Sequence, residues 1–357
     1  MARDALMNDL SALAADLIPL DTAFEPGPVD VRLVLDRIRA AGGSRWAIPK
    51  EYGGAELSDV DQLRAYDAIA SGSLSMALIQ TQRDAACRLI ARSPNRALRE
   101  RLLPALARGE RFTSVGISQL TTSRGQGGAP KMRGRLDDDA IVIDGVMPWV
   151  TGAPFCDYLV TGADLEDSRQ VLGVAWLADP GVSVQPAMRL LALTSSHTCA
   201  VTCEGVRIEQ ADIIRGPMPA ALGDRAPVRS LVVSAVGVGL ARRIVNELRN
   251  RANKLTGELA ALVERLTREF GEVSDRLYDA AARLGFDEDF SKESFRAEVN
   301  ALLARLAITL LNVAKGSGYC QPHVAERLLR EAMFLQVWSA PTTTQTETLR
   351  RLFREGE

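Results

Sequence analysis

The sequence predicts a mainly helical α+β protein in which two helical regions flank a β region. Apolar residues recur three and four positions apart before residue 110 and again after residue 228, which is the spacing of one helix face. Between residues 112 and 214 the apolar runs are short and alternating, and glycine and proline separate them, as in small β domains. The 357 residues, 46% of them hydrophobic, suffice for two or three domains with buried cores.

Residues 1–110 are predicted to form an N-terminal helical domain. Acidic residues interrupt the apolar run of the first twenty residues, and no basic stretch or cleavage site accompanies it. This segment therefore predicts an amphipathic helix and not a signal peptide. Residues 49–54 are Pro-Lys-Glu-Tyr-Gly-Gly, which indicates an irregular turn. The expected helices contain Leu10–Leu17, Val31–Ala40, Leu63–Ile69, Met76–Ile90 and Leu98–Leu106.

Residues 111–215 are predicted to form a middle antiparallel β domain. Aspartate followed by glycine favours a tight hairpin turn, so Asp144-Gly145, which follows alternating isoleucines, predicts one. Cys199 and Cys203 would share one face of a strand, because side chains alternate along it. The expected strands contain Thr113–Ser118, Ala140–Asp144, Tyr158–Thr161, Val171–Ala178, Thr198–Cys203 and Val206–Ile208.

Residues 216–357 are predicted to form a C-terminal helical domain, which begins with a linker rich in proline, alanine and glycine, Gly216–Pro227. Ser291 has the side chain of an N-cap before the third helix. Gly237 and Gly239 each weaken a helix by about 1 kcal/mol relative to alanine, so we expect another helix to approach them closely. The expected helices are Val228–Asn253, Gly257–Leu284, Lys292–Val313 and Val324–Gln336.

The charge balance and the cysteines exclude several classes of protein. Lys+Arg 43 against Asp+Glu 45 gives a formal net charge of −2, which argues against nucleic acid as a ligand. Five cysteines, an odd number, predict free thiols in a reducing compartment. With two histidines and no CxxC pair, no metal site is expected. The longest apolar stretch, Leu231–Leu240, is about half the length that spans a bilayer, so we expect no membrane insertion and a cytoplasmic location.

Two short motifs could carry chemistry. The indole of Trp149 and the hydroxyl of Thr151 could stack on and hydrogen-bond to a flat heteroaromatic ring, although a half-buried tryptophan is more often part of a core. Lys315-Gly-Ser-Gly-Tyr319 could present backbone N–H groups to a phosphate, although a glycine C-cap is the commoner role of such a turn. His197 is expected to be a loop residue and His323 a helix-start residue, rather than catalysts.

Six segments, in order along almost the whole chain, resemble motifs of the acyl-CoA dehydrogenase family. The family motifs are a P-x-E-Y-G-G-x-G turn, an L-P-x-L-x-x-G-E helix end, an N-G-x-K-x-W-I-T-N segment, a T-x-x-L-x-F-E-D-V-R-I strand pair, a G-G-x-G-Y turn and a V-E-R-L-x-R-D-A helix. The similar segments here are Ala47–Ala55, Leu103–Glu110, Val142–Gly152, Thr198–Ile208, Lys315–Tyr319 and Val324–Ala332. The resemblance implies an N-terminal helical domain, a middle β domain and a C-terminal four-helix bundle.

The resemblance also implies FAD as the cofactor. Trp149 would pack against the isoalloxazine ring, and Thr151 would hydrogen-bond near its N5 atom. The strand that carries Val115, Ile117 and Ser118 would contact the same ring. In the family, a neighbouring subunit supplies further contacts to the adenosine and the diphosphate, so a homodimer or homotetramer is implied. The corresponding positions here are Arg251, Asn312, Gly316 and Gly318.

The family reaction needs a carboxylate base, and here this sequence departs from the family pattern. The base removes the α-proton of an acyl thioester while a hydride leaves the β-carbon for flavin N5. Ser339 occupies the position of the usual glutamate, and an unassisted hydroxyl cannot act as the base. Its backbone N–H could still polarise the thioester carbonyl. Where other members place the glutamate, this chain has Arg229, so acidic residues in Gln119–Asp139 or Leu222–Arg229 are the candidate replacements.

Three functions therefore stay open. The first is α,β-dehydrogenation of an acyl thioester, carried by coenzyme A or a carrier protein, by an FAD oxidoreductase with an unrecognised base. The second is a flavin monooxygenase of the same fold, in which His197 or Ser339 would line the pocket. The third is a catalytically degenerate subunit that pairs with an active relative in a hetero-oligomer. The loss of the phenylalanine and glycine that follow Arg251 in the family motif fits the third.

Overall fold

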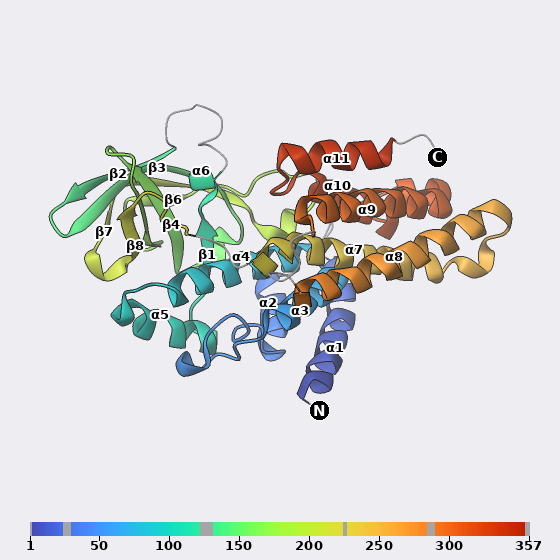
Figure 1. The fold of residues 1–357 in the computed structure, drawn as a ribbon, viewed down its shortest axis with the longest axis horizontal. Helices are drawn as coiled ribbons and strands as arrows, with labels where there is room; N and C mark the ends of the chain where they lie inside the picture. Colours follow the sequence, from blue (N-terminus) through green and yellow to red (C-terminus); the bar gives the residue numbers. More distant parts are fainter. Residues whose placement is uncertain (1, 24–29, 122–130, 224–226, 284–289, 354–357) are drawn as a thin grey trace.

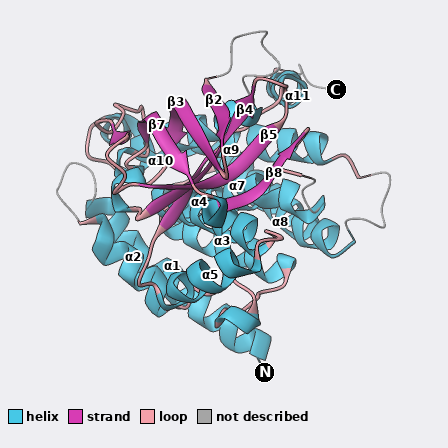
Figure 2. Cartoon of the chain, turned by 90° about the vertical axis from the view of Figure 1, so that its left-hand side faces the viewer, coloured by secondary structure: helices cyan, strands magenta, loops and turns pink. Residues whose placement is uncertain are grey.

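The computed structural model describes residues 2–23, 30–121, 131–223, 227–283 and 290–353. It confirms the predicted fold class, because helices, a β sheet and a second set of helices follow one another along the chain (Figure 1). The sheet occupies one end of the molecule, and helices from both ends of the chain pack together beside it (Figure 1). Figure 2 views the molecule from the side of the sheet, with helices behind the strands.

Five helices form the N-terminal part of the fold. Polar side chains cap four of them by accepting a hydrogen bond from a backbone N–H of the first turn. These caps are Asp30, Ser58, Ser73 and Asn95. The predicted N-terminal helix is confirmed, and its apolar face packs on α3. The five helices are α1 (Ala2–Ala23), α2 (Val31–Ala40), α3 (Asp59–Gly72), α4 (Leu74–Ala91) and α5 (Arg96–Arg108).

One eight-stranded sheet forms the middle of the fold. Its order is β6-β7-β3-β2-β4-β5-β8, and β1 pairs with β4 outside this path. The pairings are antiparallel, as predicted, except that β4 runs parallel to β1 and to β2. The strands are β1 (Thr113–Gly116), β2 (Met132–Asp137), β3 (Ala140–Val150), β4 (Tyr158–Leu165), β5 (Gln170–Trp176), β6 (Val182–Val184), β7 (Cys199–Ile208) and β8 (Ile213–Met218). A short helix, α6 (Ser118–Thr121), follows β1.

The predicted hairpin turn at Asp144-Gly145 is wrong. Both residues lie inside β3, and residues 138–139 connect β2 to β3 instead. Gly145 has φ +139°, and a Cβ atom there would lie 2.1 Å from the carbonyl oxygen of Lys131. The register of β3 against β7 also shifts between Ile143 and Gly145. The glycine therefore serves a bulge with a close backbone approach, which the dipeptide alone does not distinguish from a turn.

Four helices form the C-terminal bundle, and a fifth follows them. The predicted N-cap is confirmed, because the Oγ atom of Ser291 accepts a hydrogen bond from the N–H of Ser294. The predicted close packing at the two glycines of α7 is confirmed as well. A Cβ atom on Gly239 would lie 2.3 Å from the carbonyl oxygen of Asp67, and one on Gly237 2.8 Å from Val299. The helices are α7 (Val232–Arg249), α8 (Gly257–Arg283), α9 (Lys292–Ala314), α10 (Val324–Val337) and α11 (Thr342–Leu352).

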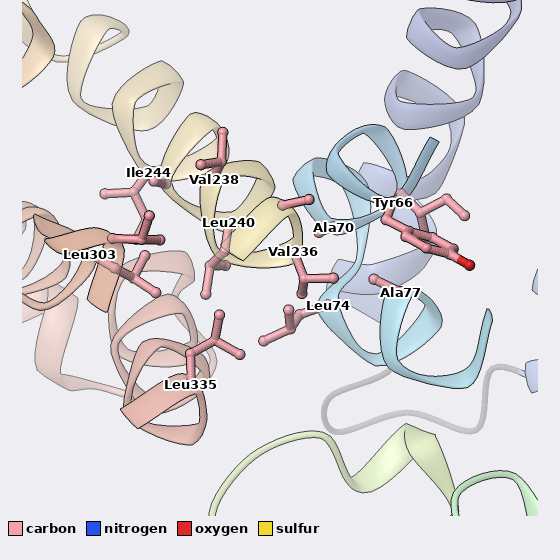
Figure 3. Packing of buried hydrophobic residues seen from close by; sticks show 14 of the residues in the cluster. Tyr66, Ala70, Leu74, Ala77, Val236, Val238, Leu240, Ile244, Leu303 and Leu335 are labelled. Carbon is pink, nitrogen blue, oxygen red and sulfur yellow. The ribbon is translucent and has the colours of Figure 1, made fainter. Parts of the chain in front are cut away.

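The largest cluster of buried apolar side chains joins the two helical parts. In Figure 3, α7 lies between the N-terminal helices, which contribute Ala70 and Leu74, and the helices that contribute Leu303 and Leu335. Because α7 is covered from both sides, most of its residues are buried. The two helical parts therefore form one core, and this core holds α4, α7, α9 and α10 in fixed positions beside the sheet.

One stretch of the described residues, Lys292–Tyr319, is long and apolar enough to cross a membrane. It consists of α9 and the 3-10 helix η8 (Lys315–Tyr319). Within the fold, 56% of its most apolar window is buried. A helix that neighbouring helices cover in a bundle is apolar on most sides, so packing explains the apolar composition of this stretch.

Candidate active site

A cavity of about 1200 Å³ lies between the sheet and the helices. We call it the central cavity. It is lined by α4, β1, the end of β3, residues 190–192, the starts of α7 and α9, the end of α10 and residues 338–341. Pockets for one drug-sized molecule are roughly 300–1,000 Å³. The central cavity is therefore large enough for a cofactor ring and a substrate side by side.

One wall of the central cavity is a single face of α4. Its lining residues recur three and four positions apart, which places them on one side of the helix. This face is apolar or neutral over its first half and cationic at its end, where Arg88 and Arg92 lie one turn apart. The seven lining residues are Leu78, Thr81, Gln82, Ala85, Arg88, Leu89 and Arg92.

The five residues predicted to contact a flavin ring all line the central cavity. They are Val115, Ile117, Ser118, Trp149 and Thr151. Trp149 lies near the end of β3 and is 56% exposed, which is unusual for so large an apolar side chain. Val115 and Trp149 lie in β1 and β3 of the same sheet, and Ile117, Ser118 and Thr151 come directly after these strands, so all five reach the cavity at two strand ends.

The hydroxyl of Thr151 belongs to a short chain of hydroxyl groups. The Oγ1 atoms of Thr151 and Thr198 lie 3.3 Å apart, and Oγ1 of Thr198 lies 2.8 Å from Oγ of Ser196. Ser196 is fully buried behind the other two. This support orients the Thr151 hydroxyl at the cavity wall, where it can donate a hydrogen bond to a ligand or accept one from it.

Ser339 also lines the central cavity, in the turn between α10 and α11. Its φ of +49° is a left-handed conformation. Arg296 of α9 holds this turn, because its Nη2 atom donates to the carbonyl oxygens of Leu335 (2.8 Å) and Trp338 (3.1 Å). The guanidinium also donates to Oδ1 of Asn300 at 3.0 Å, so all three of these acceptors are uncharged. Burial lowers the pKa of Arg296 to about 10.

The other four predicted cofactor residues lie away from the central cavity. The lining residues of α7 and α9 are at the start of each helix, whereas Arg251 follows α7 and Asn312 is near the end of α9. At 1.5 Å per residue, Asn312 is about 24 Å along α9 from Arg296. Arg251 is bonded through Nη1 to Oε2 of Glu247 at 2.6 Å. The four residues, Arg251, Asn312, Gly316 and Gly318, therefore cannot contact the same ring as Trp149 in one chain.

The predicted glycine C-cap at the end of α9 is wrong. The C-cap is Lys315, with φ +55°, and the next residues continue as η8. Gly318 serves packing instead, because a Cβ atom there would lie 2.6 Å from Cβ of Ala314. No heavy atom lies within 4 Å of a Cβ built on Gly316 in the described structure, so its backbone is open to a ligand or another subunit.

Both histidines have structural roles. Nδ1 of His323 accepts a hydrogen bond from the N–H of Ala325 at 3.0 Å and so caps α10. His197 ends a 3-10 turn with φ +44°, and its ring meets that of Phe155 edge-on at 5.0 Å. Burial lowers the pKa of His197. Neither histidine is among the residues that line the central cavity.

Glu293 is the one carboxylate among the described residues that line the central cavity. It lies in the first turn of α9, three residues before Arg296, and residues three apart share a helix face. Because Arg296 binds the carbonyl of Trp338, this face adjoins the turn that holds Ser339. Sequence reasoning missed Glu293, because nothing near it in the sequence shows that the start of α9 meets the end of α10.

The comparisons with known proteins agree with the observed architecture. Residues 4–110 match the family model of the acyl-CoA dehydrogenase N-terminal domain. A probable acyl-CoA dehydrogenase of Mycobacterium tuberculosis is 23% identical over an alignment 339 residues long, gaps included, which covers 88% of this chain and 85% of that protein.

Two solved structures share the fold. An FAD-dependent dehydrogenase superposes with a TM-score of 0.74 at 18% identity, over 94% of this chain and 96% of its own. A dibenzothiophene monooxygenase from a Paenibacillus species superposes with a TM-score of 0.80 at 15% identity, over 98% and 97%. Proteins of more than one activity therefore share this architecture, so the activity has to be argued from the site.

Proposed function

We propose that this chain belongs to the acyl-CoA dehydrogenase family and is an FAD-dependent oxidoreductase that dehydrogenates an acyl thioester between its α and β carbons. One observation carries the proposal. An exposed indole and an oriented hydroxyl, those of Trp149 and Thr151, stand together on one wall of a cavity that has room for a second ligand.

The residues of this wall fit a flavin ring. A planar heteroaromatic ring needs an apolar surface to stack on and polar atoms at its edge, which Trp149 and Thr151 supply. Val115 of β1 and Ile117, which follows that strand, add apolar area. Trp149 is 56% exposed, and removing its apolar surface from water is favourable in free energy. A ring stacked on the indole would cover that surface.

The rest of the cavity fits the substrate. When bound, FAD supplies the acceptor for the hydride that leaves the β-carbon. The protein must then hold the thioester carbonyl and accept the α-proton. The backbone N–H of Ser339, in the turn held by Arg296, can polarise the carbonyl oxygen. The carboxylate of Glu293 is the described group that can take the proton, which makes it the candidate base.

A flavin titration tests the cofactor wall. We expect the purified protein to bind FAD stoichiometrically, and Trp149→Ala to raise the dissociation constant by roughly 10- to 100-fold, the range of a lost aromatic stacking contact. Trp149→Phe is the matched control and should stay within about fivefold of wild type, because it keeps a stacking ring. Since Trp149 is largely exposed, neither change should shift the thermal midpoint. A wild-type protein that binds no FAD would contradict the proposal and favour a non-catalytic subunit.

A second candidate is a flavin monooxygenase. A monooxygenase has the same fold, and the exposure of Glu293 means that no described carboxylate lining the cavity is buried. Anaerobic mixing with acyl thioesters separates the two functions. A dehydrogenase should bleach its flavin without oxygen and give a product two mass units lighter. A monooxygenase should show no anaerobic bleaching, and should consume oxygen only when its flavin is reduced beforehand.

We also propose a homodimer or homotetramer in a reducing, cytoplasmic compartment. Part of the adenosine site would come from a neighbouring chain, because the predicted adenosine residues lie at the far end of the bundle. Two exposed apolar side chains near that end, Ile308 and Tyr319, suit such a contact. All five cysteines are free thiols, as a reducing compartment requires. Light scattering on the FAD-bound protein tests the assembly, and a monomer with full flavin occupancy would contradict it.

A further inference from the structure

Three arginines gather on one side of the central cavity. Arg88 and Arg92 end the lining face of α4, and Arg229 lies opposite them in the 3-10 helix η6 (Pro227–Leu231). All three line the cavity. The side chain of Arg229 is only 22% exposed, and its Nε atom is buried without a hydrogen-bond partner in the described structure.

The described carboxylates nearby do not balance these charges. Asp84 is paired with Arg83, whose Nη1 atom lies 2.9 Å from Oδ1 of Asp84. Asp59 is 3.7 Å from Arg229, too far for a hydrogen bond, and it is itself 42% exposed. Burial, together with the charges of Arg88 and Arg92, lowers the pKa of Arg229 to about 10. The cluster thus holds positive charge in excess.

Two other arginines of this protein are each paired with a carboxylate. Arg242 reaches Asp67 with two hydrogen bonds, Nε to Oδ1 at 2.9 Å and Nη2 to Oδ2 at 2.7 Å. Arg305 binds Glu269 in the same two-pronged way. Each of these guanidiniums has its own carboxylate, which is how charged groups inside proteins are normally stabilised. Arg229 has no carboxylate within hydrogen-bond distance in the described structure and lies beside two more cations, which leaves room for an anion that arrives with the ligand.

The cluster is also separate from the wall with Trp149 and Thr151. Ile79 of α4 lies beside Gly152, the residue after Thr151, since a Cβ atom on Gly152 would be 3.6 Å from the Ile79 side chain. Arg88 is nine residues further along α4, which is about 14 Å at 1.5 Å per residue. An anion bound by Arg88 would therefore lie well away from Gly152 and the Thr151 hydroxyl beside it.

We propose that Arg88, Arg92 and Arg229 bind a carboxylate carried by the acyl group, so that the substrate class is an acyl thioester with a second, negatively charged carboxyl group. The inference rests on the proposed function, because it names the substrate of that same cavity. A guanidinium binds a carboxylate through two parallel hydrogen bonds, and a desolvated site strengthens them. The same cations could also bind the phosphate of a phosphopantetheine carrier, so the experiment separates the two sources.

Calorimetry on the protein whose bound FAD has been reduced beforehand measures the substrate preference without turnover, because a reduced flavin cannot accept the hydride. The probes are adipyl- and hexanoyl-pantetheine, which differ only in the terminal carboxylate, and phosphopantetheine thioesters of the same two acids. We expect the adipyl thioester to bind at least tenfold tighter than the hexanoyl one, with or without the phosphate. Arg229→Gln should reduce this preference to threefold or less, and Arg92→Gln should weaken it too. Arg92 is exposed, so its replacement tests the cluster even where Arg229→Gln fails to fold.

Arg265→Gln, on the exposed face of α8, is the matched control and should leave the preference unchanged. Equal binding of adipyl and hexanoyl thioesters overturns the inference but leaves the proposed function intact. The inference is also overturned if the arginine variants lose affinity for the phosphopantetheine thioesters of both acids and keep their preference for adipyl over hexanoyl. The cluster would then bind the phosphate of the carrier. If neither thioester binds, both the proposed function and the inference fail. A retained adipyl preference without flavin reduction supports the inference and rejects the dehydrogenation.

Discussion

Replacing Gly239 by alanine should lower the free energy of unfolding by about 3 kcal/mol, at the upper end of the usual overpacking range. The new Cβ atom would lie 2.3 Å from the carbonyl oxygen of Asp67 and 2.7 Å from Cβ of Ala70. A backbone carbonyl inside α3 cannot move aside as a flexible side chain could. Any shift of α3 would also disturb Asp67, which binds Arg242 at 2.7 Å and the hydroxyl of Tyr278 at 2.5 Å. Urea unfolding followed by circular dichroism measures the loss.

The matched control for this prediction is Gly271→Ala in the interior of α8. A Cβ atom on Gly271 meets no heavy atom of the described residues within 4 Å, so the substitution adds helix propensity without a clash. It should raise the free energy of unfolding by about 0.5–1 kcal/mol. If the two variants change stability in the same direction, close packing at Gly239 is not what sets its identity.

Most of the fold could be predicted from the sequence because it depends on local spacing. The start of α9 was predictable from Ser291, whose side chain can satisfy a free N–H of the first turn whatever lies elsewhere. The close packing at the two glycines of α7 could also be predicted, because two residues that disfavour a helix need a compensating contact. The cavity wall with Trp149 and Thr151 could be predicted in part for a similar reason, since the two residues are close in sequence at one strand end.

Other features could not be predicted, because they depend on which elements meet in space. Gly145 has the local sequence of a turn, and only the approach of Lys131 from the neighbouring strand makes it a bulge. Arg229 and Arg88 are far apart in the sequence, and they face one cavity only because η6 leads into α7 beside α4. The candidate base is a third case, since Glu293 and Ser339 line the same cavity only because α9 packs on α10. The spacing of residues in a single sequence does not show which distant segments contact each other.

Replacing Glu293 by glutamine should slow anaerobic flavin reduction by an acyl thioester about 100- to 1,000-fold, within the range that a general base contributes. The amide keeps the size of the side chain and removes its proton-accepting charge. Stopped-flow absorbance of the flavin measures the rate, and titration with the same thioester measures binding. Binding should stay within about threefold of wild type, because Glu293 is exposed at the cavity wall and is proposed to act on the α-proton.

A second glutamate separates this role from a general effect of charge at a helix start. Glu258 occupies the first turn of α8 as Glu293 does that of α9, and it does not line the central cavity. Both carboxylates interact favourably with the positive end of a helix, so Glu258→Gln and Glu293→Gln should lower stability by the same few tenths of a kcal/mol. Only Glu293→Gln should slow reduction. Ser339→Ala should change the rate by less than about tenfold, because the proposed contact uses its backbone N–H. If the flavin of Glu293→Gln is reduced at the wild-type rate, a group other than Glu293 removes the α-proton.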